Sequence, residues 1–211
     1  MFQDRADAGE QLADRLEERG VEADVVLGIP RGALPVARPV ADRLDAALDI
    51  IAAKKMGMPG NSEFAVGAAA ADGSAWIDDE LVERYGIDEE YLEAERERAA
   101  ETAREKLETY RGDRPEPDLE GKRVVVVDDG VATGATARAC LRQIRAADAA
   151  RVVLAVPVGP PASLSELEPE ADKVVAVEEP ASFTAVGAFY RDFGQVTDEE
   201  ARQYLGWTAD A

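Results

Sequence analysis

The stretch VVVVDDGVATGAT, residues 124–136, decides the fold class. Its four consecutive valines predict a β-strand that is buried on both faces, because a continuous run of β-branched residues leaves no face for water. The small residues that follow predict a tight loop. Apolar residues then recur at helical spacing from Ala137 to Ala147, which predicts an amphipathic helix. A buried strand, a loop and a helix in this order form the repeating unit of a parallel α/β sheet.

The rest of the chain repeats this alternation. Short apolar runs predict further strands at residues 23–29, 47–53, 152–158 and 173–178. Helical patterns cover residues 1–20, 33–44 and 88–110. Capping-box spacing predicts two more helix starts, at Ser163 and Thr197. We therefore predict one α/β domain over residues 1–211, with a mainly parallel central sheet flanked by helices.

Three connecting segments interrupt the alternation. Asp72-Gly73 lies between two short apolar stretches within residues 64–77 and predicts a β-hairpin. Gly, Pro and Asn residues at 57–61 predict a loop. Residues 111–118, rich in Pro and charge, predict a linker inside the domain.

The composition excludes several classes of protein and of site. The chain has no histidine and a single cysteine, Cys140, which excludes histidine-based triads, an internal disulfide and a typical zinc site. No apolar run approaches the ~20 residues that cross a membrane, and the first residues lack the pattern of a signal peptide. We therefore expect a cytoplasmic protein without a membrane partner, whose chemistry uses carboxylates, Lys, Arg, hydroxyls, backbone amides and a hard cation such as magnesium.

The charge balance is strongly acidic. With 44 Asp and Glu residues against 24 Lys and Arg residues, the net charge is −20, which argues against nucleic acid as a partner. Only five of the basic residues are lysines. Scarce lysine with abundant acid and alanine resembles the proteins of salt-loving organisms, in which salt screens the self-repulsion. An ordinary acidic cytosolic protein is the alternative.

The residues after the Val-rich strand have the chemistry of a ligand site. Asp128 and Asp129 follow the strand directly, and are placed to hold sugar hydroxyls or a hydrated cation. The small-residue loop behind them lets backbone amides approach a ligand closely, while Thr133 and Thr136 add hydroxyl donors. With the N-terminus of the helix, these donors form an anion cradle suited to a phosphate. A plain strand–turn–helix with a capping threonine is the alternative interpretation.

This segment resembles the phosphoribosyl pyrophosphate (PRPP) motif of the type I phosphoribosyltransferases, a hydrophobic strand, two acids and a small-residue loop ending in Thr-Gly-x-Thr. The resemblance implies that family's fold with a small hood subdomain. It also implies a homodimer that binds PRPP, Mg²⁺ and a small-molecule base. Asp128 and Asp129 would hold the ribose hydroxyls, directly or through magnesium, and stabilise the positive charge that develops on the ring. The 5′-phosphate of PRPP would lie on Ala132, Thr133, Gly134, Ala135 and Thr136.

Two further segments resemble other parts of the family. Residues 28–35, GIPRGALP, are similar to its pyrophosphate loop, which implies a cis Pro30–Arg31 peptide bond and a leaving group bound by Pro30, Arg31 and Gly32. Lys54-Lys55 and the loop after them, to Asn61, stand where the family carries its flexible catalytic loop. Lys55 and Arg31 would neutralise the departing pyrophosphate. A common Pro-Arg-Gly turn and two solvated lysines are the alternatives that the residues themselves leave open.

The resemblance also implies a hood over the base, built from residues 1–20 and 179–211. Because aromatic faces stack on planar bases, we expect Phe189 and Tyr190 to contact the base, together with Glu179. The alternative for the rings is a small hood core.

One position departs from the oxopurine members of the family, which carry an acid where this chain has Ala132. A hood acid such as Glu179 or Asp192 would then handle the proton of the base, or the reaction needs no general base. The departure argues against hypoxanthine or guanine as the acceptor.

We therefore expect a phosphoribosyltransferase that moves the ribose 5-phosphate group of PRPP to a nitrogenous base and releases pyrophosphate. A module that senses PRPP or a nucleotide without catalysis is the first alternative, although Arg31 and Lys55 favour an enzyme, because a sensor has less need of a clamp on the leaving group. The second is an enzyme of the same fold that hydrolyses or phosphorylates a sugar phosphate.

Overall fold

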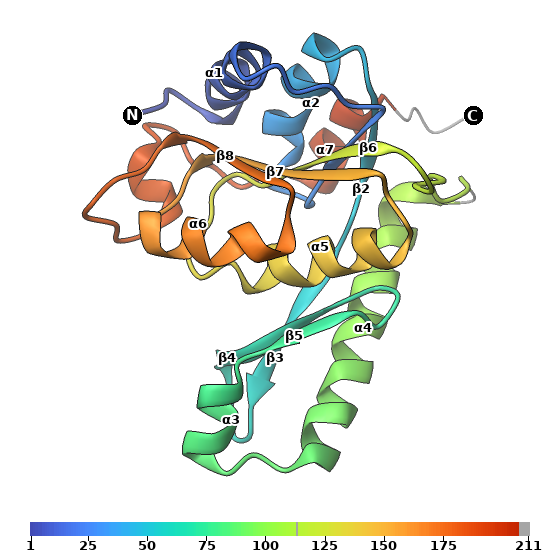
Figure 1. Cartoon of the computed structure of the whole chain (residues 1–211), viewed down its shortest axis with the longest axis vertical. Helices are drawn as coiled ribbons and strands as arrows, with labels where there is room; N and C mark the ends of the chain where they lie inside the picture. The colour runs from blue at the N-terminus through green and yellow to red at the C-terminus, as the bar shows by residue number, and fades with distance from the viewer. Residues whose placement is uncertain (113, 207–211) are drawn as a thin grey trace.

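Five parallel strands form the central sheet, seen in the upper half of Figure 1. In pairing order they are β2 (Ala47–Ile50), β1 (Val25–Gly28), β6 (Arg123–Val127), β7 (Arg151–Val158) and β8 (Lys173–Glu178). The computed structural model describes residues 1–112 and 114–206. Gly28 aligns with Val127, so β1 and β6 end side by side at one edge of the sheet. The predicted parallel α/β sheet is confirmed.

Helices cover both faces of this sheet. α1 (Arg5–Glu18) and α2 (Leu34–Arg43) pack on one face, and α5 (Ala135–Ala146) and α6 (Pro161–Leu167) on the other, above and below the sheet in Figure 1. α7 (Asp198–Leu205) packs beside α2. The buried valines of β6 alternate between the two faces: Val125 and Val127 join the core under α1 and α2, and Val126 the core under α5. A continuous valine run is therefore needed to fill both layers.

An arm, residues 53–111, extends from the sheet in Figure 1. It consists of an antiparallel sheet of β3 (Ala53–Met58), β4 (Asn61–Ala70) and β5 (Ala75–Ile77), followed by α3 (Asp79–Tyr85) and α4 (Glu89–Arg111). The small residues Ala68 and Ala70 of β4 pack against Ala135 and Ala139 of α5. This close contact fixes the base of the arm over the start of α5.

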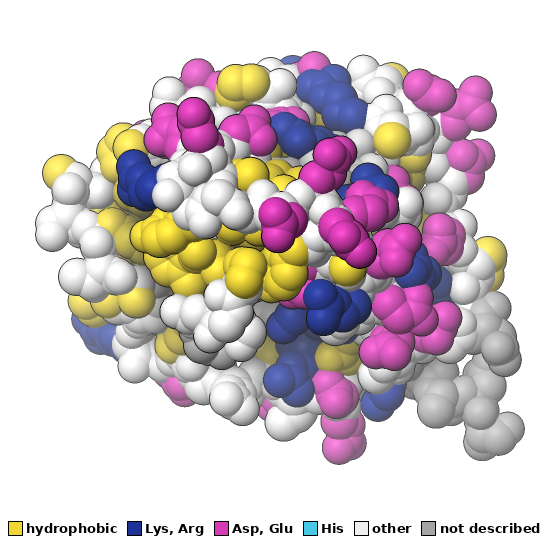
Figure 2. All heavy atoms as spheres, turned by 90° about the horizontal axis from the view of Figure 1, so that it is seen from below, with side chains coloured by type: hydrophobic (Ala, Val, Ile, Leu, Met, Phe, Trp, Pro, Cys, Tyr) yellow, Lys and Arg dark blue, Asp and Glu magenta, His cyan; other side chains and the backbone are white. Residues whose placement is uncertain are grey.

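The exposed side of α4 carries paired charges, as its sequence predicts. Arg96 pairs with Glu93 at 2.6 Å, and Arg104 with Glu101 at 2.6 Å. Figure 2 shows acidic and basic side chains intermingled on one side of the molecule, beside a hydrophobic area. Each exposed pair contributes little to stability, but together the pairs reduce the repulsion between neighbouring acidic side chains.

The loop predicted over residues 57–61 is wrong. β3 continues to Met58 and β4 begins at Asn61, so only Pro59 and Gly60 form the turn. The reason is a contact with α4: the Gly57 amide donates to Glu95 at 3.1 Å, and its carbonyl accepts from the Tyr91 hydroxyl at 2.9 Å. Tertiary partners thus hold a glycine-rich segment in strand conformation.

Other boundaries also differ from the predictions. The strand predicted over 47–53 ends at Ile50. The helix predicted to start at Ser163 begins at Pro161, and the Ser163 hydroxyl donates to the Ala132 carbonyl instead. The capping box at Thr197 and the hairpin at Asp72-Gly73 are confirmed.

The N-terminal residues pair with a segment that follows β8, far along the chain. The Phe2 amide donates to the Phe189 carbonyl at 2.8 Å, and the Arg191 amide to the Phe2 carbonyl at 2.9 Å. Two short 3₁₀ helices, Glu168–Glu170 and Val186–Phe189, complete the secondary structure. The predicted hood segment 179–211 includes residues 207–211, which lie outside the described residues. Among the described helices, none has the length and apolar character needed to cross a membrane.

Candidate active site

The loop after β6 presents backbone donors at the edge of the sheet. Gly134 is the N-cap residue of α5 with φ +77°, in the left-handed region that glycine adopts readily. The first amides of α5 have no partner inside the helix, because an α-helix leaves its first four N–H groups unbonded. This is the strand–loop–helix order that the sequence predicts for the phosphate cradle.

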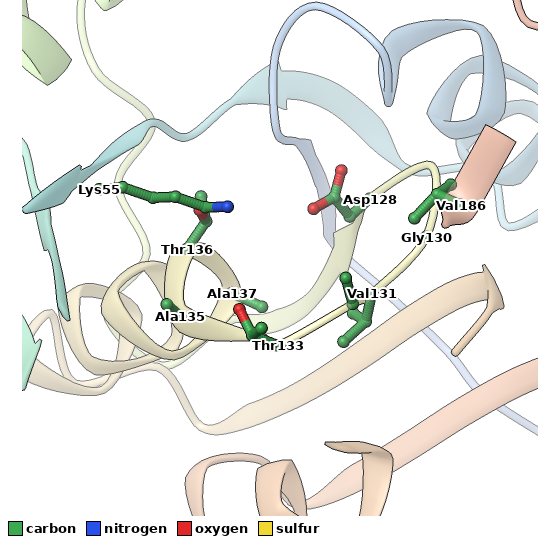
Figure 3. A pocket seen from close by; sticks show the side chains of 11 residues that line it. Lys55, Asp128, Gly130, Val131, Thr133, Ala135, Thr136, Ala137 and Val186 are labelled. Carbon is green, nitrogen blue, oxygen red and sulfur yellow. The ribbon is translucent and has the colours of Figure 1, made fainter. Parts of the chain in front are cut away.

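A cavity of about 190 Å³ lies over these donors. Its walls are residues 130–137, Asp128, Lys55 and Val186. Figure 3 shows the Lys55 side chain reaching from the arm toward Thr136, and Asp128 at the opposite end of the cavity. The structure thus brings the predicted phosphate loop, one predicted acid and one predicted lysine to a single cavity.

Asp128 and Asp129 are enclosed carboxylates with different partners. Burial, reinforced by the charge of Asp129, raises the pKa of Asp128 well above its usual range. Asp128 Oδ1 accepts a hydrogen bond from the Asp129 amide at 2.9 Å. Burial also raises the pKa of Asp129, although Arg5 opposes this shift by donating from Nε to Oδ2 at 2.9 Å.

Gly32 of the predicted pyrophosphate loop touches the same acid. A Cβ atom at Gly32 would lie 2.3 Å from Asp129 Oδ2, well inside van der Waals contact. Only a residue without a side chain lets the loop after β1 approach the acids after β6 this closely. The two predicted ligand segments are therefore in direct contact.

The carboxylates fit a magnesium ion that arrives with a phosphorylated substrate. Within the described residues, no three acidic, cysteine or histidine side chains cluster as a metal site would require. Mg²⁺ commonly binds through one or two carboxylates plus substrate phosphates and water. Asp128 and Asp129 can supply that number of ligands, and Asp128 has no ion pair within the described part of the chain.

The predicted pyrophosphate loop has the cis Pro30–Arg31 peptide bond that the resemblance implies. Arg31 is exposed, and its Nη1 lies 3.2 Å from Asp198 Oδ1. Asp198 also accepts from the Tyr110 hydroxyl at 2.6 Å, and this bond is the main reason why its pKa is lowered. Arg31 is thus paired with α7, and it is not among the residues that line the cavity over the phosphate loop.

The predicted base-contacting residues lie in three different settings. Glu179 is exposed, and Phe189 stacks on Phe183 with ring centroids 5.5 Å apart. Tyr190 is 6% exposed, packs against Phe2, and donates its hydroxyl to the Asp129 carbonyl at 2.6 Å. Its burial raises its pKa. Tyr190 thereby holds the backbone of Asp129 in place. Its contact with the nitrogenous base of a substrate stays a prediction.

Comparison with known proteins places this arrangement in a family. The sequence profile of the phosphoribosyl transferase domain matches residues 3–193. The chain belongs to the phosphoribosyltransferase family. A crystal structure of the protein TT1426 from Thermus thermophilus is 45% identical, covers 99% of both chains and superposes with a TM-score of 0.82. The type I phosphoribosyltransferase-like fold predicted from the motif is confirmed.

Two Mycobacterium tuberculosis proteins from strains CDC 1551 and H37Rv, provisionally named phosphoribosyl transferases, are also similar to the chain. Each is 44% identical over 206 residues, which is 97% of this chain and 46% of the relative. The chain therefore spans about half the length of these mycobacterial relatives.

Two residues of this candidate site were not predicted. Arg5 holds Asp129, donates to the Gly194 carbonyl at 2.7 Å and stacks 3.8 Å from the Phe193 ring centroid. Lys106 of α4 donates through Nζ to the Pro30 carbonyl. Its pKa is lowered, chiefly by burial. A signal for Lys106 was present, because it lies on the same helical side as the apolar residues Ala103 and Tyr110.

Proposed function

We propose that the chain transfers the ribose 5-phosphate group of PRPP to a nitrogenous base and releases pyrophosphate. The observation that carries this proposal is the single cavity in which the donor loop, residues 130–137, lies beside Asp128 and Lys55. Phosphate donors, a carboxylate and a cation in one cavity match the three chemically distinct parts of PRPP.

The donor loop would anchor the 5′-phosphate. Gly134 and Ala135 line the cavity and have small or no side chains, so their amides are open to an anion, and Thr136 adds a hydroxyl. The N-terminus of α5 favours negative charge at this point. Binding energy from this remote phosphate would orient the anomeric carbon for attack.

Asp128 and Asp129 would act on the ribose. Positive charge develops on the ring as pyrophosphate departs, and a fixed carboxylate stabilises that charge more than it stabilises the ground state. Arg5, Gly32 and the Tyr190 hydroxyl hold Asp129 in place. Mg²⁺ bound with PRPP would neutralise phosphate charge, and Asp128 and Asp129 would hold it directly or through water.

Lys55, Arg31 and the amides after Pro30 would receive the pyrophosphate. Arg31 must first leave Asp198, and both partners of that pair are about half exposed, so its loss costs little. On the other side of the ribose, Phe189, Tyr190 and Glu179 would form the base site. Glu179 or Asp192 would take up the base proton, if a general base is needed.

The test is a panel of nitrogenous bases incubated with PRPP and Mg²⁺, with release of pyrophosphate as the readout. We expect at least one base to be consumed, and Asp129→Asn to lower turnover by about 10² or more, as loss of a transition-state contact does. Unchanged turnover in that variant would remove the proposed role of Asp129. PRPP binding without turnover on any base would support the sensing module instead. We expect the active species to be a cytoplasmic homodimer.

A further inference from the structure

Three of the five lysines gather beside the candidate site. Lys54 and Lys55 come from β3, and Lys106 from α4. Within the described residues, none of the three has a carboxylate oxygen within 4.0 Å, whereas arginines elsewhere pair closely, such as Arg111 with Asp49 at 2.8 Å. In a chain with 44 acids, lysines without an acidic partner leave positive charge available for an outside anion.

Lys106 is the most enclosed of these lysines. It lies among buried residues of α4, Ala103 and Tyr110, while Lys54 and Lys55 are exposed. Its Nζ donates to the Pro30 carbonyl, which brings it to the predicted pyrophosphate loop. Asp128 acts to raise the pKa of Lys106, and Arg31 and Lys54 act to lower it, so the ammonium interacts with one acid of the site and with two other cations.

The ammonium of Lys106 has more donors than the protein satisfies. An ammonium group carries three N–H bonds, and Pro30 is the one acceptor found among the described residues. A partly buried cation is costly unless it is paired and fully hydrogen-bonded. Asp128 attracts the Lys106 ammonium electrostatically, but in the described structure it accepts no hydrogen bond from it. An anion between Lys106, Arg31 and Lys54 would satisfy both needs.

We propose that Lys106 binds the pyrophosphate group of PRPP, as a cation supplied by α4 from outside the motifs that identify the family. This rests on the proposed function. The pyrophosphate end is favoured over the 5′-phosphate because Lys106 contacts the loop after β1, whereas the 5′-phosphate loop follows β6. The alternative is a tether that holds the arm to the body of the protein through Pro30 and meets no ligand.

Calorimetric titration with two separate probes distinguishes these roles. Inorganic pyrophosphate with Mg²⁺ reports on the leaving-group end, and ribose 5-phosphate on the other. The variant Lys106→Met keeps the length and packing of the stem but removes the charge. Lys106→Arg restores a cation, and Lys122→Gln removes an exposed positive charge far from the site as a matched control.

We expect Lys106→Met to weaken pyrophosphate binding by about tenfold or more, as loss of a charged hydrogen bond does, and ribose 5-phosphate binding by less than about twofold. Lys106→Arg should recover most of the loss, and Lys122→Gln should leave both affinities unchanged. Equal weakening of both probes would assign Lys106 to the tether, and unchanged pyrophosphate binding would refute the proposal. Wild-type protein that binds neither probe would instead overturn the proposed function, and the role of Lys106 with it.

A second measurement needs no variant. Acetylation of the wild-type lysines by acetic anhydride, mapped by mass spectrometry, should slow at Lys106 when Mg²⁺ and pyrophosphate are present, and proceed unchanged with ribose 5-phosphate. Equal labelling of Lys106 in all three conditions would contradict direct contact. Lys122 serves as the internal reference for the activity of the reagent.

Discussion

Replacing Asp128 with asparagine should stabilise the protein while it abolishes function. Burial and the adjacent Asp129 charge raise the pKa of Asp128, so the folded state opposes its ionisation. For an acid whose pKa is raised on folding, stability is greatest below the unfolded value of 3.8 and is lost as the pH rises through the folded value. At neutral pH the raised pKa of Asp128 therefore costs the folded wild type stability, and Asp128→Asn removes that cost.

The size of the effect follows from what the substitution leaves in place. Asparagine has the same shape, so no cavity forms, and its Oδ1 still accepts from the Asp129 amide. The repulsion from Asp129 disappears, and the attraction to Lys106 and Arg5 is lost with it. We expect a net gain of about 1 kcal/mol, in the range of other substitutions that relieve functional strain. For a chain of this size that is a rise in Tm of about 2–4 °C.

Urea unfolding at two pH values provides the assay. The gain should be present at about pH 8 and shrink toward about pH 4, where wild-type Asp128 is protonated as well. Asp24→Asn is the matched control with the opposite sign, because hydrogen bonds from Arg123 lower the pKa of Asp24. That variant should lose stability at both pH values, because the contribution of an acid with a lowered pKa is lost only as the pH falls below the unfolded value of 3.8. An Asp128→Asn protein that is less stable at high pH, or a gain that does not depend on pH, would refute the electrostatic reasoning.

Three further outcomes are expected. Lys55→Ala should lower turnover by about tenfold or more, and by a larger factor than it weakens PRPP binding. The reason is that Lys55 would stabilise the negative charge that grows on pyrophosphate as it departs. A larger change in Kd for PRPP than in kcat would show that Lys55 binds substrate and transition state equally well. Gly32→Ala should lower the free energy of unfolding in urea by about 1–3 kcal/mol, because the new Cβ would lie 2.3 Å from Asp129 Oδ2 and force one of the two residues to move. An unchanged free energy of unfolding would show that the loop can shift without cost. Molar potassium chloride should raise Tm, because it screens a net charge of −20, whereas a flat or falling Tm would argue against adaptation to salt.

The sheet and the phosphate loop could be predicted from the sequence because local residues determine both. The short run of β-branched valines in β6 favours a strand buried on two sides, and Gly134 marks the turn into α5. The cis bond at Pro30–Arg31 followed from position within a known motif rather than from local physics.

The arm could not be predicted in the same way, because its strands depend on distant partners. Gly57 and Gly60 suggest a loop, and nothing near them in the sequence shows that Glu95 and Tyr91 hold Gly57 from a helix. Arg5 was missed for a similar reason: an arginine at the start of an acidic helix has no local feature that points to Asp129. Lys106 is different, since a lysine on the apolar side of a helix is a local irregularity that could have been pursued.

The acid pair explains why these separate segments form one site. Arg5 from the N-terminal helix, Gly32 from the loop after β1, and Tyr190 from the segment beyond β8 all contact Asp129. Lys106 acts on Asp128 from the arm. Two enclosed carboxylates in adjacent positions destabilise the fold by themselves, so the surrounding cations and hydrogen bonds must come from whatever elements reach them. A cation or sugar that binds Asp128 and Asp129 would therefore weaken or strengthen their contacts with the arm and with the terminal segments at the same time. The reason is that each of these segments interacts with the negative charge that the ligand neutralises.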